Sequence, residues 1–334
     1  MYTDEDLDYA IEKDVLTASS VNQFRQLMAE SRETPLGDEE NFRLITGFND
    51  IFVVIACLLS LISVAWFMTL ASSSASALAF ALLSWGLAEY FVRKRKMAFP
   101  AIILLLTFIG GVFFLVQELL ADTMGSVSYW AYLTATLAAL LHWRRFRVPI
   151  TVAAGAAAAT GLLVSLFISV FPDPGKWLQV FIVFCGLLVF LLAMHWDASD
   201  IKRVSHRSDV AFWLHLLSAP LVIHPIFSGL GILQGDDSPL NMIAVVLLYL
   251  VMTAVSLLID RRALMVSSLG YVLYALSTLI ATYGGPGQSF AVTGVLVGAS
   301  LLLLSAYWHQ ARAGLLVLLP AALGRFVPPV ASTH

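Results

Sequence analysis

Cysteine and charge are both scarce in this chain. Only two of its 334 residues are cysteine, Cys57 and Cys185, and both lie inside apolar stretches, which excludes a disulfide framework and a thiolate metal site. Charged residues make up 12% of the chain and hydrophobic residues 59%, so there is too little polar surface to cover a soluble globule. The composition predicts a protein that has lipid as its solvent.

The chain also lacks the basic start and apolar core that are typical of a cleavable signal peptide. Its first residues are acidic, and residues 1–50 hold 12 of the 22 acidic residues but only 4 of the 19 basic ones. An acidic segment repels nucleic-acid phosphate, so no nucleic-acid partner is expected. We expect the first membrane segment to direct insertion.

Long apolar runs dominate the rest of the sequence. Each is close to the ~20 residues that cross ~30 Å of hydrocarbon at ~1.5 Å per residue. Breaks rich in Gly, Pro, Asp and Ser separate alternate runs and favour tight hairpins. The sequence therefore predicts an all-α polytopic membrane helix bundle of about ten helices in five hairpins, with runs near 51–70, 75–92, 98–120, 127–143, 148–171, 177–196, 210–231, 240–259, 263–283 and 289–310.

The basic residues lie at alternate breaks between these runs. Of the 19 Lys and Arg residues, 18 fall on one side of the predicted topology and only Lys176 falls on the other. Basic residues concentrate in cytoplasmic loops, which predicts that both termini are cytoplasmic and favours the bacterial inner membrane as the location. At the inner end of the second run, Glu89 is expected to pair with Arg93, four residues later.

Polar segments flank the predicted bundle. We expect residues 1–48 to form a cytoplasmic helical N-terminal arm, 49–312 the transmembrane bundle and 313–334 a cytoplasmic interfacial tail. In the arm, Thr3 and Thr17 are expected to cap two amphipathic helices. About 30 residues cannot build a core alone, so the arm needs docking or a partner. It is either a regulatory, partner-binding arm or a lid that covers the bundle.

Two segments near the ends of the chain carry a family resemblance. Residues 11–23, which contain Asp14-Val15-Leu16-Thr17, resemble the opening of an uncharacterised bacterial family of polytopic membrane proteins with a short helical N-terminal tail. Residues 301–320 are similar to the last helix of the same family. Asp14 stands here in place of the Gly that this family has in its turn, and no Gln-Ala pair follows. The resemblance implies a polytopic membrane fold and no assigned activity.

The seventh run carries two histidines and two prolines. Pro220 and Pro225 each remove a backbone donor, which predicts a kinked helix that borders other helices or a polar pocket. At helical spacing His224 shares a face with Trp213 and Pro220, and His215 falls on the opposite face. Ionisable groups inside a membrane are costly, so this run is either a ligand or proton site, or a place where His bonds to neighbouring helices. The candidate pathway or ligand residues are His224, Pro220, Trp213, His215, Tyr271 and Tyr274.

The loop before that run gathers acidic, basic and imidazole side chains. Such a cluster can bind a divalent cation or a phosphate headgroup, but its spacing matches no metal template, so no metal or cofactor is predicted. The favoured interpretation is a solvated, partly paired loop in which Asp209 caps the next helix. The cluster consists of His195, Asp197, Asp200, Arg203, His206, Arg207 and Asp209.

Small residues mark two further runs as contact faces. Gly155 and Gly161 lie in an alanine-rich stretch of the fifth run, and Gly294 and Gly298 are four residues apart in the tenth. Small residues let helices approach closely, either within one chain or across a homo-oligomer, for which Gly294 and Gly298 are the candidates. Residues 315–320 are apolar but too short to span, and predict an interfacial helix.

Two functions of different classes fit this pattern. The favoured one is a carrier or permease for a small polar or amphipathic molecule, with the seventh run as the wall of the pathway. The alternative is a non-transporting scaffold or sensor that holds partners or anionic lipid through the acidic arm and the basic loops. An intramembrane enzyme ranks third, because no Ser, Cys or carboxylate stands at a recognisable spacing from His215 or His224. Membrane lipid is the expected partner, and a small-molecule ligand is a hypothesis.

Overall fold

The computed structural model describes residue 7 and residues 10–13, 15–24, 48–124, 129–171, 173–200, 205–230, 238–284 and 289–317. These residues form helices and short connections, with no strand among them. Contacts divide the chain into two units, Met1–Phe42 with Ala331–His334, and Arg43–Val330. The division falls close to the predicted end of the N-terminal arm at residue 48.

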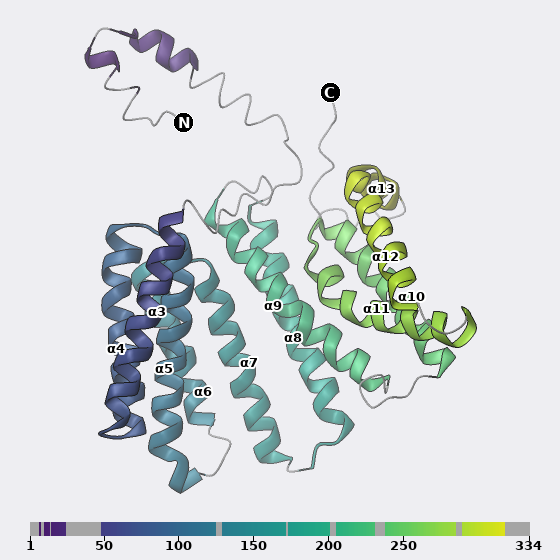
Figure 1. Ribbon diagram of the computed structural model, residues 1–334, viewed down its shortest axis with the longest axis horizontal. Coiled ribbons are helices and arrows are strands. Elements are labelled where there is room, and N and C mark those ends of the chain that lie inside the picture. The colour runs from purple at the N-terminus through teal and green to yellow at the C-terminus, as the bar shows by residue number, and fades with distance from the viewer. Residues whose placement is uncertain are drawn as a thin grey trace. The chain divides into compact units, whose positions relative to one another are not determined.

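Ten long helices follow one another in the described part of the second unit (Figure 1). They coincide, in order, with the ten predicted apolar runs. A π-helical segment, η1, continues α4, and a short helix, α13, follows α12. The bounds are α3 Phe48–Thr69, α4 Ser73–Ala88, η1 Glu89–Lys94, α5 Ala98–Met124, α6 Tyr129–Phe146, α7 Ile150–Val170, α8 Lys176–Ala198, α9 His206–Gly229, α10 Pro239–Ile259, α11 Ala263–Gly284, α12 Ser289–Ala306 and α13 Trp308–Leu316.

Several of these helices suit a membrane. In the described ranges, eight are long and apolar enough to cross one, or nine if α12 and α13 form one bent span. Helix α6 is not among the eight, and its 18 residues include His142, Arg144 and Arg145. In the described part of the chain, the predicted apolar runs are therefore helices, and eight or nine of them are long and apolar enough to cross a membrane.

In the first unit, Thr17 begins a short helix as predicted. The backbone N–H of Ser20 donates to Thr17 Oγ1 at 3.2 Å, which is the expected N-cap bond. Residues 18–24 are helical, with Val21 buried and Phe24 exposed. The other predicted cap, Thr3, lies outside the described residues.

Helix α9, the predicted seventh run, is the most enclosed of the candidate spans. It packs against α7, α8 and α11, and Figure 1 shows it side by side with α8. In the 18-residue apolar stretch of α9, 56% is buried, against 39% in the corresponding stretch of α5, the next highest. The helix with two prolines and two histidines therefore joins the helices that precede it to those that follow.

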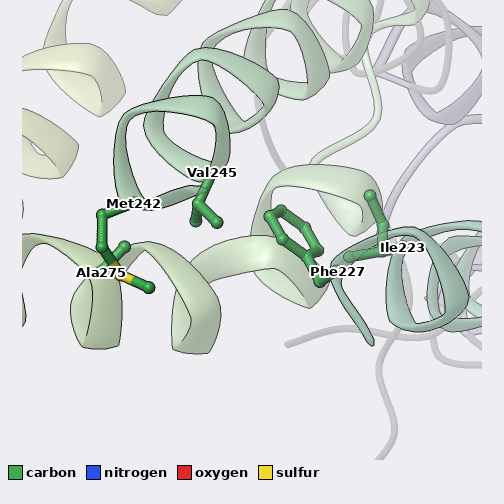
Figure 2. Close-up of a cluster of buried hydrophobic side chains, with 5 residues drawn as sticks. All are labelled: Ile223, Phe227, Met242, Val245 and Ala275. Carbon is green, nitrogen blue, oxygen red and sulfur yellow. The ribbon is translucent and has the colours of Figure 1, made fainter. Parts of the chain in front are cut away.

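Apolar side chains fix α9 against α10 and α11. Figure 2 shows Ile223 and Phe227 of α9 with Met242 and Val245 of α10 and Ala275 of α11, and all five are fully buried. Between helices that are already out of water, such contacts stabilise through van der Waals packing, because lipid tails are as apolar as the side chains. This cluster holds one end of α9 in place.

Glycine allows close contact between α6 and α7. A Cβ on Gly155 would stand 3.2 Å from the Cβ of Ala139, and one on Gly161 would stand 2.3 Å from the ring of Tyr132. The contact face predicted for the fifth run is therefore confirmed within one chain. For Gly294 and Gly298 of α12, no atom of the described residues lies within 4 Å of such a Cβ. A contact between copies at these two glycines stays a prediction.

The chain turns sharply after α12. Helix α12 ends at Ala306, and α13 is bent by 75° from it. The short helix expected over 315–320 therefore begins earlier, at Trp308, and the predicted boundary at residue 312 falls inside α13. Trp308 and Arg312 are both buried, which explains why the helix starts before the apolar stretch that predicted it.

Candidate functional site

Helix α9 begins at a serine held by an aspartate. Asp200 Oδ2 accepts hydrogen bonds from the backbone N–H of Ser205 at 2.9 Å and from its hydroxyl at 2.6 Å. Ser205 Oγ in turn accepts from the backbone N–H of Arg207 at 3.3 Å, so Ser205 is the N-cap residue. The prediction that Asp209 caps this helix is wrong. Asp209 lies in the first turn, 3.5 Å from His206, where its charge still opposes the helix dipole.

The two histidines of α9 lie in different surroundings. His215 is 1% exposed, whereas His224 and Pro220 are exposed. Trp213 is half-buried and packs against a cluster that includes Val189 and Leu214. Trp213 is therefore more enclosed than His224 and Pro220, the two residues predicted to share its face.

His224 forms a polar pair with Tyr271 of α11. His224 Nδ1 lies 2.5 Å from the Tyr271 hydroxyl, and the Tyr271 ring stacks on Phe227 with centroids 4.5 Å apart. The contact brings together two predicted pathway residues that are 47 positions apart. Tyr274, one turn further along α11, is 41% exposed. His224 and Tyr271 thus bring an imidazole, a hydroxyl and an aromatic ring together at one place inside the apolar stretch.

A buried ion pair lies near the beginning of α9. Arg261, which follows α10, donates from Nη2 to Asp197 Oδ1 at 2.7 Å and from Nε to Asp197 Oδ2 at 3.2 Å. Asp197 is 6% exposed and Arg261 is 2% exposed. Arg261 Nη2 also contacts the carbonyl oxygen and the hydroxyl of Ser208 in α9, at 3.3 and 3.2 Å. Removing both charges from water is costly, and the bidentate geometry and added hydrogen bonds offset that cost.

His215 is the third ionisable group at this pair. Its Nε2 lies 3.5 Å from Asp197 Oδ2, and the Phe190 ring meets the imidazole edge-on at 5.4 Å between centroids. The Ser256 hydroxyl donates to the Arg261 carbonyl oxygen, which fixes the turn after α10. We name Asp197, Ser208, His215 and Arg261 the inner cluster. It joins the end of α8, the first half of α9 and the turn between α10 and α11.

A second polar network begins at the residue next to Arg261. Asp260 closes α10 in the left-handed conformation, with φ of 57°, and its Oδ1 accepts from Trp308 Nε1 at 2.8 Å. Arg312 Nε lies 3.9 Å from the same oxygen and donates to the Leu257 carbonyl oxygen at 3.2 Å. The Arg262 guanidinium lies 4.8 Å from the Trp308 ring centroid. These contacts attach α13 to the end of α10.

The predicted loop cluster separates into buried and exposed members. The interpretation of a solvated loop is wrong for Asp197, because an arginine from a later hairpin buries it. His195, His206 and Arg207 are exposed, while Arg203 lies outside the described residues. Within the described ranges, no three His, Cys, Asp or Glu residues gather to hold a metal ion.

Sequence reasoning missed Arg261, Ser208, Asp260 and Trp308 as members of these networks. The adjacent acidic and basic residues at Asp260 and Arg261 were the available signal, but a basic residue at such a break is also typical of any cytoplasmic loop. Comparison with family models, curated proteins and solved structures finds no match for this chain. The family resemblance of the end segments therefore stays a prediction.

Proposed function

We propose that the chain crosses the bacterial inner membrane ten times with both termini in the cytoplasm. The ten long helices coincide with the ten apolar runs, and 18 of the 19 basic residues belong to one side of that topology. Helix α6 becomes a span if its basic end lies at the cytoplasmic interface, where long Arg side chains reach water.

Within this topology, we propose a carrier or permease for a small polar or amphipathic molecule. The observation that carries the proposal is the exposed His224, paired with Tyr271 beside the exposed Pro220. A polar pair on a lipid-facing surface is costly, whereas one that borders a hydrated path or a ligand is not. The imidazole and hydroxyl supply hydrogen bonds and the Tyr271 ring supplies an apolar face, which suits an amphipathic molecule.

The inner cluster has a role in the same proposal. In the described conformation, Arg261 in the turn after α10 bonds to Asp197 of α8 and to Ser208 of α9, and so holds these three parts together. A carrier must alternate between two arrangements, and a buried ion pair at one end of the pathway helix is a bistable contact that can be made in one arrangement and broken in the other. We propose that the pair belongs to the arrangement that is closed on the cytoplasmic side.

The test compares cells that express the full chain with cells that carry the empty vector. Untargeted mass spectrometry measures each metabolite inside the cells and in the medium. We expect the chain to shift the distribution of at least one small molecule, and His224→Leu and Tyr271→Phe to abolish that shift at unchanged membrane levels. Tyr132→Phe is the matched control, because Tyr132 belongs to α6 and packs on Gly161 and Phe113, not on His224 or Tyr271. No shift for the unmodified chain, or full activity in both variants, would contradict the carrier.

The scaffold or sensor remains the second candidate. It is supported by the separate contact unit of Met1–Phe42 and by the acidic composition of that end of the chain. Deleting residues 1–42 separates the two functions. A carrier keeps its transport after the deletion, whereas a scaffold loses its partner and the bundle stays folded.

A further inference from the structure

Helix α4 widens into the π-helical segment η1 at Glu89–Lys94. The backbone N–H of Arg95 donates to the Tyr90 carbonyl oxygen, five residues back, at 3.1 Å. Such i→i+5 turns are rare and concentrate at functional sites. Arg93 and Lys94 follow Glu89 by four and five residues, one turn further along the helix.

A hollow of about 490 Å³ opens beside this segment. It is lined by Gly86, Glu89, Tyr90, Arg93 and Lys94. A Cβ built on Gly86 would meet nothing within 4 Å, so the absent side chain leaves open space at the helix surface. A glycine, an aromatic ring and a pair of adjacent basic residues, which follow one another along the helix, therefore line the hollow together with Glu89.

The one acidic residue of the hollow is already neutralised. Arg145 of α6 donates from Nε to Glu89 Oε1 at 2.6 Å and from Nη2 to Glu89 Oε2 at 2.9 Å, a bidentate pair. The predicted partner, Arg93, makes a longer contact of 3.4 Å to Glu89 Oε2. Lys94 Nζ lies 5.9 Å from the Tyr90 ring centroid. Arg93 and Lys94 thus bring positive charge that Glu89 does not cancel.

We propose that this hollow binds a phosphate group, carried either by an anionic lipid headgroup or by free phosphate. The guanidinium fork of Arg93 matches phosphate oxygens, Lys94 adds a point charge, and the exposed Tyr90 has a hydroxyl that can donate. Bases beside a membrane helix attract anionic lipid in general, but here a widened turn and an open glycine supply a shaped place for one group. The proposal does not depend on the carrier, because its residues lie on α4 and η1.

The experiment uses the purified full-length protein in detergent. The probes are dioctanoyl phosphatidylglycerol, inorganic phosphate and, as a headgroup-free control, dioctanoylglycerol. Affinity is measured from the rise in the thermal unfolding midpoint with ligand concentration. Gly86→Leu fills the hollow and keeps its charge, and the double variant Arg93→Gln with Lys94→Gln removes the charge and keeps the space. Arg207→Gln removes one charge from an exposed arginine outside the hollow and serves as the matched control.

We expect phosphatidylglycerol to bind and dioctanoylglycerol not to bind. The double variant should weaken binding at least about tenfold, the scale of one charge-assisted hydrogen bond, and Gly86→Leu should weaken it at least as much by occupying the space. Arg207→Gln should bind as the unmodified chain does. Binding of inorganic phosphate with the same dependence on the variants identifies free phosphate as the ligand, and binding of the lipid alone identifies the headgroup.

Three results would overturn the phosphate site. These are no binding of either phosphate probe, equal affinity in the double variant and the unmodified chain, or an equal loss in Arg207→Gln. If Gly86→Leu lowers the unfolding midpoint without ligand, the double variant decides alone.

Discussion

Asp197 accepts two hydrogen bonds from Arg261 although the residues are 64 positions apart in the chain. Because Arg261 also contacts Ser208, a single guanidinium joins α8, α9 and the turn after α10. His215 lies at the same carboxylate, so α9 approaches this pair at both Ser208 and His215. Any movement of α9 relative to α8 must therefore change the surroundings of a buried charge.

Neutralising one partner of this pair should strongly destabilise the fold. Asp197→Asn or Arg261→Gln leaves the other charge buried without its partner, and we expect a loss of about 3–5 kcal/mol in the free energy of unfolding. The double variant Asp197→Asn with Arg261→Gln should lose much less than the sum of the single losses, because neither charge then stays buried without its partner. The measurement is unfolding in mixed micelles titrated with sodium dodecyl sulfate.

Exposed residues of the same types provide the controls for this pair. Asp173 and Arg207 are exposed, and Asp173→Asn and Arg207→Gln should each change stability by no more than about 0.5 kcal/mol. Additive losses at Asp197 and Arg261 would show that the two side chains do not act as a buried pair.

Substitutions at His224 and Tyr271 should separate function from folding. His224→Leu removes a hydrogen bond between α9 and α11, which in membrane proteins is worth on the order of 1 kcal/mol or less. Tyr271→Phe should cost a similar amount, and the double variant should cost little more than either, since one bond is lost in all three. Unfolding in the same micelles measures the cycle. A loss of several kcal/mol would make His224 a structural residue and weaken the carrier proposal.

The docking of α13 should depend on Trp308. Trp308→Phe keeps the aromatic packing but removes the donor to Asp260, so we expect a loss of about 1 kcal/mol, confined to the end of the chain. Hydrogen exchange of the backbone amides in residues 310–316 should speed up about fivefold, while α9 amides stay protected. Unchanged exchange in α13 would show that the Trp308 side chain does not hold this helix.

Adding a methyl group should destabilise the fold at Gly161 but not at Gly294. Gly161→Ala drives a Cβ into the Tyr132 ring of α6 and should cost about 1–3 kcal/mol. Gly294→Ala meets open space in the chain and should be neutral for the monomer. If α12 forms a contact between copies, Gly294→Leu with Gly298→Leu should abolish the dimer in light scattering while the monomer stays folded. A dimer that survives both leucines would place the contact elsewhere.

The proposed topology makes a direct prediction for reporter fusions. Fusions at Gly175 and Gly285 should report the external side, and fusions at Arg145 and at the C-terminus should report the cytoplasm. The reason is the location of all basic residues except Lys176 on one side. A cytoplasmic signal at Gly175 would change the number of helices that cross the membrane.

The helices were the predictable part of this molecule. Hydrophobic run length depends on local composition alone, so the ten runs located the ten long helices. Local spacing also located the Thr17 cap and the close contact at Gly155 and Gly161. The Asp209 cap failed because Ser205, held by Asp200, is also a cap candidate a few residues earlier, and spacing alone does not rank the two.

The inner cluster could not be predicted in the same way. Asp197 and Arg261 belong to different predicted hairpins, and no local sequence pattern around either residue indicates that the two pair. Arg261 also matches the pattern of the other basic residues at breaks that are predicted to be cytoplasmic. The pairing of His224 with Tyr271 could not be predicted either, although both residues were predicted to be polar groups inside apolar runs.

The separation of Asp197 from Arg261 has a consequence for synthesis of the protein. At about 5–20 residues per second, several seconds pass between the production of the acidic and the basic partner. During that time the packed helices α8 and α9 hold a carboxylate that its native neutralising group has not yet reached. A nascent chain that stops before Arg261 therefore keeps an uncompensated charge at a place from which the finished protein excludes water, and we expect it to be less stable than the complete chain.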